Sequence, residues 1–211
     1  ILHAIKAKEE VEVVTFAYDI NSKHRDIVAK MKIASFVCDQ IEDAVKEADL
    51  VILAIPVGSM KKVANLIAPF LKKNTVVTDT GSTKRSVITD INPYMPDNVY
   101  FIPSHPLAGT EYSGPESGFS SLFENRYWLI VCNKQTKETE KLVSFFEKLG
   151  SIVEIVNTEY HDKILAITSH LPHLIAYTIV GTASDLETDL KNDVIKFSAS
   201  GFRDFTRIAS S

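Results

Sequence analysis

The chain has 211 residues, of which 45% are hydrophobic and 24% charged, a composition typical of globular proteins. Its formal net charge of -4 supplies no basic face for a phosphate backbone, so we do not expect nucleic acid as a partner. The longest uninterrupted apolar runs are strand-sized, well below the roughly 20 residues that cross a bilayer, and we expect no membrane span.

Strand-sized and helix-sized segments alternate through the first three quarters of the chain. Residues 1–8 fit the end of a helix, residues 11–18 are rich in β-formers, and residues 23–31 favour a helix. The run 50–55 is apolar on both faces, as in a central parallel strand that helices cover. We expect further strands at 35–38, 75–78, 99–102, 127–132 and 152–155, and helices at 41–48, 59–71, 84–94 and 137–149. This order predicts an α/β fold, a Rossmann-type doubly wound, mostly parallel sheet.

The pattern changes at residue 157. Residues 160–184 favour a helix and no strand-sized run follows, so an all-α domain is expected after the sheet. We therefore place a nucleotide-binding domain at residues 1–156 and a helical domain at residues 157–211. Cys38 and Cys132 lie far apart beside apolar residues, which is typical of buried reduced thiols in a cytoplasmic protein.

A dinucleotide-binding sheet usually begins with a strand, a glycine-rich turn and a helix, with an acidic residue about 20 residues later that binds the ribose. Residues 1–8 fit the end of that helix, and Asp19 follows the next strand. We therefore expect the first strand and the glycine turn to be missing before residue 1. A carboxylate at Asp19 favours NAD, whereas the basic residues 23–25 leave NADP open. The alternative for Asp19 is a helix cap.

Two further positions at strand ends are candidates for ligand binding. Pro56 closes the run 50–55, where small residues allow a flat cofactor to approach the backbone. Ser82 and His105 lie in two segments that read as loops after strands, and ligands bind at the carboxyl ends of strands in such sheets. A histidine there is a candidate for proton chemistry near neutral pH.

Four motifs carry a family resemblance: DTGSTK at 79–84, HPLAGTE at 105–111, SHLPH at 169–173 and GFRDFTRIA at 201–209. In this order they resemble the prephenate and arogenate dehydrogenases of tyrosine biosynthesis. The resemblance implies NAD(P)-dependent oxidative decarboxylation, of prephenate to 4-hydroxyphenylpyruvate or of arogenate to tyrosine. We favour prephenate with NAD and keep arogenate as the alternative.

The resemblance also implies roles for single residues. His105 matches the catalytic histidine that accepts from the ring hydroxyl as hydride leaves, and Ser82 matches a serine beside the nicotinamide that helps to orient it.

The resemblance implies that a second set of matched residues binds the substrate. Arg207 matches the arginine that binds a substrate carboxylate, for which a planar guanidinium is well suited, and Arg203 assists. His173 matches a residue at the substrate, with His170 beside it, and Glu111 matches an acid at the pocket mouth.

The same residues allow other interpretations. His170 and His173 lie three apart, but Pro172 intervenes and no third ligand has a metal spacing, so no metal is expected. His161 begins a helix as a candidate cap and is assigned no chemistry. A β-hydroxyacid dehydrogenase is less favoured, because it would show a catalytic lysine on the helical domain.

The last alternative is an inactive fragment. The expected phosphate turn is missing, and the family continues past residue 211 through helices that build a dimer. We expect the full-length protein to be a homodimer.

Overall fold

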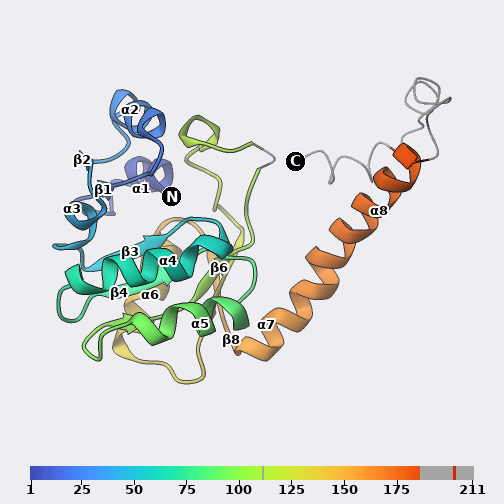
Figure 1. Ribbon diagram of the computed structural model, residues 1–211. Helices are drawn as coiled ribbons and strands as arrows, with labels where there is room; N and C mark the ends of the chain where they lie inside the picture. Colours follow the sequence, from blue (N-terminus) through green and yellow to red (C-terminus); the bar gives the residue numbers. More distant parts are fainter. Residues whose placement is uncertain (111, 186–201, 203–211) are drawn as a thin grey trace. The chain divides into compact units, whose positions relative to one another are not determined.

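The computed structural model describes residues 1–110, 112–185 and 202 (Figure 1). The chain divides into two compact units, Ile1–Asp162 and Lys163–Ser211. The strands are β1 (Phe16–Ala17), β2 (Phe36–Val37), β3 (Leu50–Leu53), β4 (Val76–Asp79), β5 (Tyr100–Phe101), β6 (Ser104–Pro106), β7 (Tyr127–Val131) and β8 (Ile152–Val156). The helices are α1 (Leu2–Ala7), α2 (Ser22–Met31), α3 (Ile41–Val45), α4 (Val57–Ile67), α5 (Arg85–Ile91), α6 (Lys137–Lys148), α7 (Thr158–Leu165) and α8 (Leu171–Asp185), with 3-10 turns at Ala68–Phe70, Asn92–Tyr94 and Pro115–Ser117.

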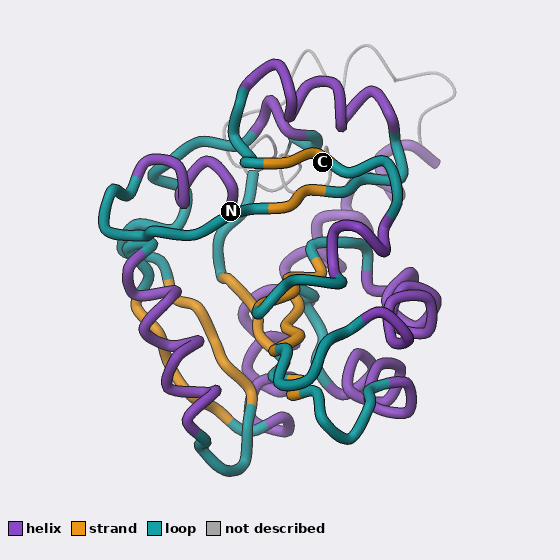
Figure 2. Tube along the Cα trace, turned by 90° about the vertical axis from the view of Figure 1, so that its left-hand side faces the viewer, coloured by secondary structure: helices purple, strands orange, loops and turns teal. Residues whose placement is uncertain are grey.

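The predicted α/β class is confirmed, and the hydrogen bonding divides the strands into three sheets. β3, β4 and β5 form a parallel sheet in which Leu53 pairs with Asp79, and β1 and β2 form a parallel pair of their own. β7 pairs with β8 in parallel and with β6 antiparallel. The β1–β2 pair lies apart from the other strands (Figure 2).

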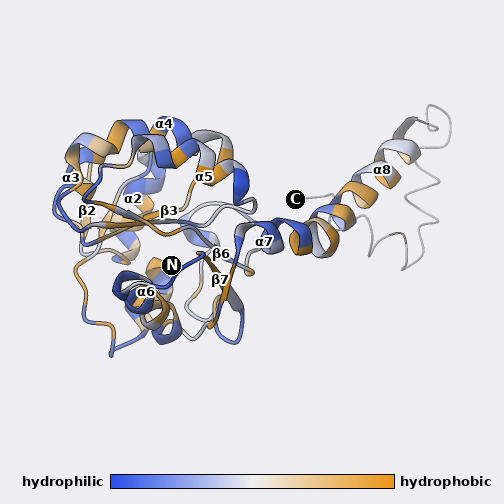
Figure 3. Cartoon of the chain, turned by 90° about the horizontal axis from the view of Figure 1, so that it is seen from below, coloured by the Kyte–Doolittle hydropathy of each residue, from blue (hydrophilic) through white to orange (hydrophobic). Residues whose placement is uncertain are grey.

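Helices cover both faces of the β3–β4 sheet (Figure 3). Val51, Leu53 and Val77 pack against α4 and α5 on one face. Alternate residues of the same strands, Ile52 and Val76 among them, face a second core around α6. This alternation is the strand period of two, which explains why the run was apolar throughout. The sheet is therefore doubly wound as predicted.

The second core is built on stacked aromatic rings. Trp128 of β7 and Phe146 of α6 are wholly buried, with ring centroids 3.7 Å apart. Helix α6 begins with a capping box in which the Thr136 and Thr139 side chains each accept from the other's main-chain N–H. This helix therefore holds β7 against the rest of the unit.

Helix α7 continues through a π-helical turn, Ala166–His170, into α8. The N–H of Leu171 donates to the Ala166 carbonyl, five residues earlier. Pro172 has no N–H with which to bond the Thr168 carbonyl, which accounts for a widened turn at this place. The predicted long helix is therefore present, with one irregular turn.

One helix bears on the expectation of no membrane span, which stays a prediction. Among the described residues one continuous helix, Thr158–Ala183, is long and apolar enough by length and composition alone to cross a membrane. Sequence reasoning counted uninterrupted apolar runs, and this helix reaches the length with polar residues interspersed. Apolar side chains of this helix are exposed, including Ile167, Leu174 and Tyr177.

Candidate functional site

The carboxyl end of β4 carries a buried carboxylate. Asp79 is wholly buried, and its oxygens accept from the N–H of Gly81 at 2.8 Å and of Ser104 at 3.1 Å. A Cβ at Gly81 would lie 3.0 Å from both Asp79 Oδ2 and the Met60 methyl group. Glycine therefore lets the chain turn closely around this carboxylate.

Lys84 supplies the charge that faces Asp79. Its side chain is wholly buried, and Nζ donates to Asp79 Oδ2 and, at 2.6 Å, to the Ser104 carbonyl. Burial lowers the pKa of Lys84 and raises that of Asp79, while the contact between the two groups opposes both shifts. Removal of either partner of a buried ion pair leaves the other as an uncompensated charge, which strongly destabilises the fold.

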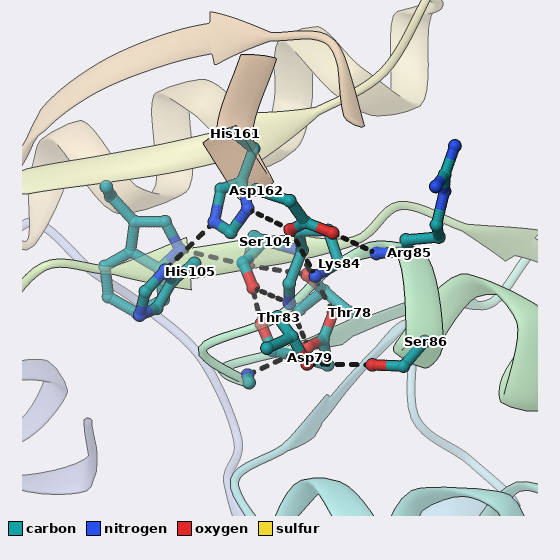
Figure 4. Close-up of polar contacts among 12 residues, drawn as sticks. Thr78, Asp79, Thr83, Lys84, Arg85, Ser86, Ser104, His105, His161 and Asp162 are labelled. Atoms are coloured by element: carbon teal, nitrogen blue, oxygen red, sulfur yellow. Dashed lines mark hydrogen bonds and ion pairs between the residues drawn. The ribbon is translucent and has the colours of Figure 1, made fainter. Parts of the chain in front are cut away.

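Ser104 completes what we call the buried polar cluster: Thr78, Asp79, Lys84, Ser104 and Trp128. Figure 4 labels the first four of these residues. The serine hydroxyl donates to the Asp79 carbonyl at 2.8 Å and accepts from Thr78 Oγ1 and Trp128 Nε1, each at 2.9 Å. Both of its lone pairs and its hydrogen are used. The cluster therefore connects β6 to β4 and to β7, immediately before His105.

His105 lies in strand β6, where Pro106 and a loop-like motif had predicted a loop. It pairs with Leu129 across the antiparallel ladder, and its ring is half-buried. Its Nδ1 lies 3.0 Å from His161 Nε2, with the two rings edge to face (Figure 4). A strand position held by the cluster gives this ring less freedom than a loop would.

His161 and Asp162 continue the chain of contacts from His105. His161 is wholly buried near the start of α7, and its Nδ1 lies 2.7 Å from Asp162 Oδ1. The carboxylate of Asp162 accepts the main-chain N–H groups of Lys84 at 2.8 Å and Arg85 at 2.9 Å. Asp162 therefore joins α7 to the start of α5.

The pKa of His161 and that of Asp162 are both lowered, for different reasons. Burial lowers the pKa of His161, and its bond with Asp162 offsets this only in part. Burial alone would raise the pKa of Asp162, but the N–H groups of Arg85 and Lys84 and the His161 ring together outweigh it, so its pKa is lowered. The arrangement favours a neutral ring beside a charged carboxylate.

Ser82 is exposed in the connection between β4 and α5 and makes no hydrogen bond with the described residues. The expected link between Ser82 and His105 is not among the contacts of the structure. His161, to which sequence reasoning assigned no chemistry, contacts the catalytic candidate instead.

The cofactor candidates lie at strand ends as predicted. Asp19 follows β1, where its carboxylate accepts from the N–H of Asn21 at 2.8 Å and lies 3.1 Å from His24 Nδ1. Arg25 donates to the Asp19 carbonyl at 2.8 Å and pairs with Asp39 at 3.4 Å. Pro56 is the residue before α4, just after β3.

The remaining candidates lie in the second unit or outside the description. His170 ends the π-helical turn, and His173 is exposed in α8 with Nδ1 2.8 Å from the Ser169 carbonyl. Glu111, Arg203 and Arg207 lie outside the described residues. No three His, Cys, Asp or Glu side chains of the described residues group as metal ligands.

Sequence reasoning missed the buried partners of the site. Asp79 and Lys84 belonged to a recognised motif, but only their spacing around Gly81 hinted at a bond between them. The adjacent pair of His161 and Asp162 at a helix start was the other available signal, and it was interpreted as a cap.

Comparisons with known proteins give one consistent result. The family model for the prephenate dehydrogenase nucleotide-binding domain matches residues 3–155, and the model for the prephenate dehydrogenase dimerization domain matches residues 157–211. The domain boundary predicted at residue 157 stays a prediction, since the compact units divide after Asp162.

Named relatives agree with the family models. A cyclohexadienyl dehydrogenase of Zymomonas mobilis is 40% identical over 202 residues, 95% of this chain and 69% of that protein. A prephenate dehydrogenase of Bacillus subtilis is 31% identical over 196 residues, 92% of this chain and 53% of that protein. A crystal structure of prephenate dehydrogenase from A. aeolicus in complex with hydroxyphenyl propionate and NAD+ is 30% identical, with a TM-score of 0.88 over 100% of this chain and 73% of that one.

Proposed function

Because the chain belongs to the prephenate dehydrogenase family, we propose that it takes part in the NAD-dependent oxidative decarboxylation of prephenate to 4-hydroxyphenylpyruvate. The substrate ring carries a hydroxyl group on the carbon that loses hydride and a carboxylate on the opposite carbon. Hydride loss gives that carbon ketone character, and the C–C bond to the carboxylate then breaks. The electron pair of that bond completes an aromatic phenol, and carbon dioxide leaves.

His105 is the residue we assign to the hydroxyl proton. It accepts the proton as hydride leaves and returns it to the oxygen of the phenol, so that the ring ends the cycle as it began. The observation that carries this assignment is the anchoring of His105 on two sides, by Ser104 in the buried polar cluster and by His161 at 3.0 Å. A general base must be held in place in this way.

The cofactor proposal rests on Asp19. Its side chain is 44% exposed, and the bonds from Asn21 and His24 orient its carboxylate, which fits an acceptor for the ribose hydroxyls of NAD. NAD would supply the hydride acceptor. Arg25 is engaged with the Asp19 carbonyl and with Asp39, which favours NAD over NADP because a free guanidinium is needed for a 2′-phosphate. Pro56, the residue before α4, is assigned to the same cofactor site because it follows a strand.

Substrate contacts are proposed for residues that the family motifs mark. An arginine suits a carboxylate of the substrate because it binds it in a planar, bidentate contact, and the exposed hydroxyl group of Ser82 suits a contact with the cofactor. The residues are Arg207 with Arg203 for the carboxylate, His173 with His170 and Glu111 around the substrate, and Ser82 at the nicotinamide.

Arogenate is the second candidate substrate, because the Zymomonas relative is named for cyclohexadienyl substrates in general. Prephenate and arogenate differ by a keto or an amino group on the side chain. Turnover of both substrates with NAD and with NADP separates these possibilities. Family membership sets aside the β-hydroxyacid dehydrogenase alternative.

His105→Asn tests the central assignment. We expect turnover to fall on the order of 10²- to 10⁴-fold, the contribution typical of a general base, with little change in the dissociation constant for NAD. Equal turnover in variant and parent would remove His105 from the mechanism.

Arg207→Ala should chiefly raise the KM for prephenate, and a change confined to NAD affinity would contradict its carboxylate role.

The fragment alternative needs its own comparison. The 211-residue chain is assayed beside a form completed at both ends with the corresponding segments of the Zymomonas relative, which this chain covers to 69% of its length. Activity of the completed form alone would identify the chain as an inactive part of an active enzyme. Inactivity of both would contradict the proposed function. We also propose that the full-length protein is a cytoplasmic homodimer. Sedimentation of the completed form tests whether it is a dimer.

A further inference from the structure

We propose that His161 and Asp162 are positioning residues that fix the tautomer of His105, with hydrogen on Nδ1 and the lone pair on Nε2. This inference rests on the proposed role of His105 as proton acceptor. It follows from three hydrogen bonds in sequence, each of which determines where the next hydrogen must lie.

Asp162 begins the sequence because it is able only to accept. Its carboxylate oxygens already receive the main-chain N–H groups of Lys84 and Arg85, which have no lone pair to offer. The lowered pKa of Asp162 agrees with a charged carboxylate at neutral pH. Its Oδ1 also lies 2.7 Å from His161 Nδ1. The hydrogen between these two atoms therefore belongs to His161 Nδ1.

The position of the hydrogen on His161 determines which atom donates in its contact with His105. The His161 ring is wholly buried, and burial lowers its pKa, which favours the neutral form with one ring hydrogen. Lys84 adds to this lowering, and Asp79 and Asp162 oppose it. With that hydrogen on Nδ1, His161 Nε2 carries a lone pair and is able only to accept. It lies 3.0 Å from His105 Nδ1, so His105 must donate.

His105 is thereby held as the tautomer that the reaction needs. With hydrogen on Nδ1, a neutral His105 presents a lone pair at Nε2 and accepts from a substrate hydroxyl group. The opposite tautomer would present an N–H there, which donates and takes up no proton. When His105 becomes a cation, its Nδ1–H bond to His161 is kept, and the charge of Asp162 lies at the far side of that ring (Figure 4).

The same residues also fix where the ring stands. Asp162 clamps the main chain at Lys84, and the side chain of Lys84 bonds to the Ser104 carbonyl, one residue before His105. His161 and His105 are therefore tied to one another through the buried polar cluster as well as directly.

Asp162→Asn is the direct test. An amide in place of the carboxylate offers one acceptor atom where three N–H donors converge. With its oxygen at the Oδ1 position it still accepts from His161 and Lys84, and its NH₂ group faces the N–H of Arg85; with its NH₂ group at the Oδ1 position it donates to His161 Nδ1 and moves the hydrogen of His161 to Nε2 and that of His105 to Nε2 in turn. In both orientations the carboxylate charge that supports a cationic His105 is lost. We expect kcat to fall on the order of 10²- to 10⁴-fold, with the KM for prephenate and the NAD dissociation constant within about twofold of the parent.

The matched control is Asp97→Asn, because Asp97 is exposed and lies before β5, at the opposite ends of the strands from His105. It should leave kcat unchanged.

Two variants at position 161 add a rescue experiment. His161→Gln keeps an acceptor atom for His105 Nδ1–H and should retain more activity than His161→Met, which has no comparable acceptor. Equal losses in both would contradict the tautomer role and indicate packing alone.

A spectroscopic measurement separates this inference from the proposed function. Ring ¹⁵N shifts of His105, assigned by comparison with His105→Asn, should show the Nδ1–H tautomer in the parent and a shift toward Nε2–H in Asp162→Asn. An Nε2–H tautomer in the parent would overturn the inference even if His105 proves essential. Retained turnover in His105→Asn would overturn the proposed role while leaving the tautomer result intact.

Discussion

The two units of the chain place polar and apolar groups in opposite ways. In the first unit Asp79, Lys84 and His161 are wholly buried. In the second unit Ile167 and Leu174 of the long helix are 66% and 64% exposed. The buried groups are tolerated because each has hydrogen-bond partners within its own unit, whereas the exposed apolar side chains lack that compensation. The first unit therefore buries polar groups, and the second exposes apolar ones.

The match of residues 157–211 to a dimerization domain agrees with this contrast. An apolar helix face of this kind is covered in an assembled protein by another apolar surface. The family relationship therefore favours a protein partner for this helix over a lipid one, although its length and composition fit both. Experiments that reverse polarity in either unit test the contrast.

The largest effect is expected from Lys84→Met, which breaks the polar interior. It leaves the buried Asp79 carboxylate without its cation, and removal of one partner of a buried pair costs about 3–5 kcal/mol of unfolding free energy. Chemical denaturation measures this loss. Lys61→Met, at an exposed position of α4, is the control and should change stability by less than about 0.5 kcal/mol. A double variant with Asp79→Asn should lose less than the sum of the single losses.

A smaller effect is expected from Leu174→Lys, which makes the apolar exterior polar. A leucine side chain buried on association contributes about 1.5–3 kcal/mol, so self-association should weaken roughly 10- to 100-fold. Sedimentation velocity over a concentration series measures it on the completed form. Thr182→Lys adds the same charge to the same helix at a position already polar and exposed. Equal weakening by both variants would show that charge, and not the apolar face, governs assembly.

The smallest effect is a pH dependence of stability carried by His161. Its folded-state pKa lies below the ordinary value of 6.5, so the unfolded chain binds this proton more readily. Its contribution to stability is therefore full at neutral pH and declines as the pH falls below about 6.5, by up to about 1.4 kcal/mol per pH unit. His161→Gln should remove this part of the slope between about pH 7 and pH 5. His173→Gln, at an exposed ring, should leave the slope in place.

The strands and helices of the first unit were predictable because their periodicities reflect which faces are buried. The run 50–55 was apolar throughout, and it became β3 with a core on each face. Strand β6 was missed because it has only three residues, one of them proline, and pairs with β7 from across a loop. Local pattern carries no information about such a distant partner.

The sequence singled out His105 as a candidate, which stays a prediction, but it did not indicate the residues that contact it. His105 was identified from its motif and its place after a strand, and the structure puts it in contact with His161. Ser82 was expected to orient it and has no such contact among the described residues. A histidine–aspartate pair at a helix start resembles many caps, and only the packing of α7 against β6 and α5 distinguishes it.

By itself the sequence determined the α/β class, the alternation of most strands and helices, the family resemblance and the residue at which proton chemistry is proposed. The class and the alternation follow from periodicity, and the family resemblance follows from four motifs in order. The tertiary structure alone decided that Lys84 is buried, that Ser104 accepts two side-chain donors, and that His161 contacts both Asp162 and His105. Hydrogen bonds between distant residues depend on angles and distances of a few ångströms, which the linear order of residues does not specify.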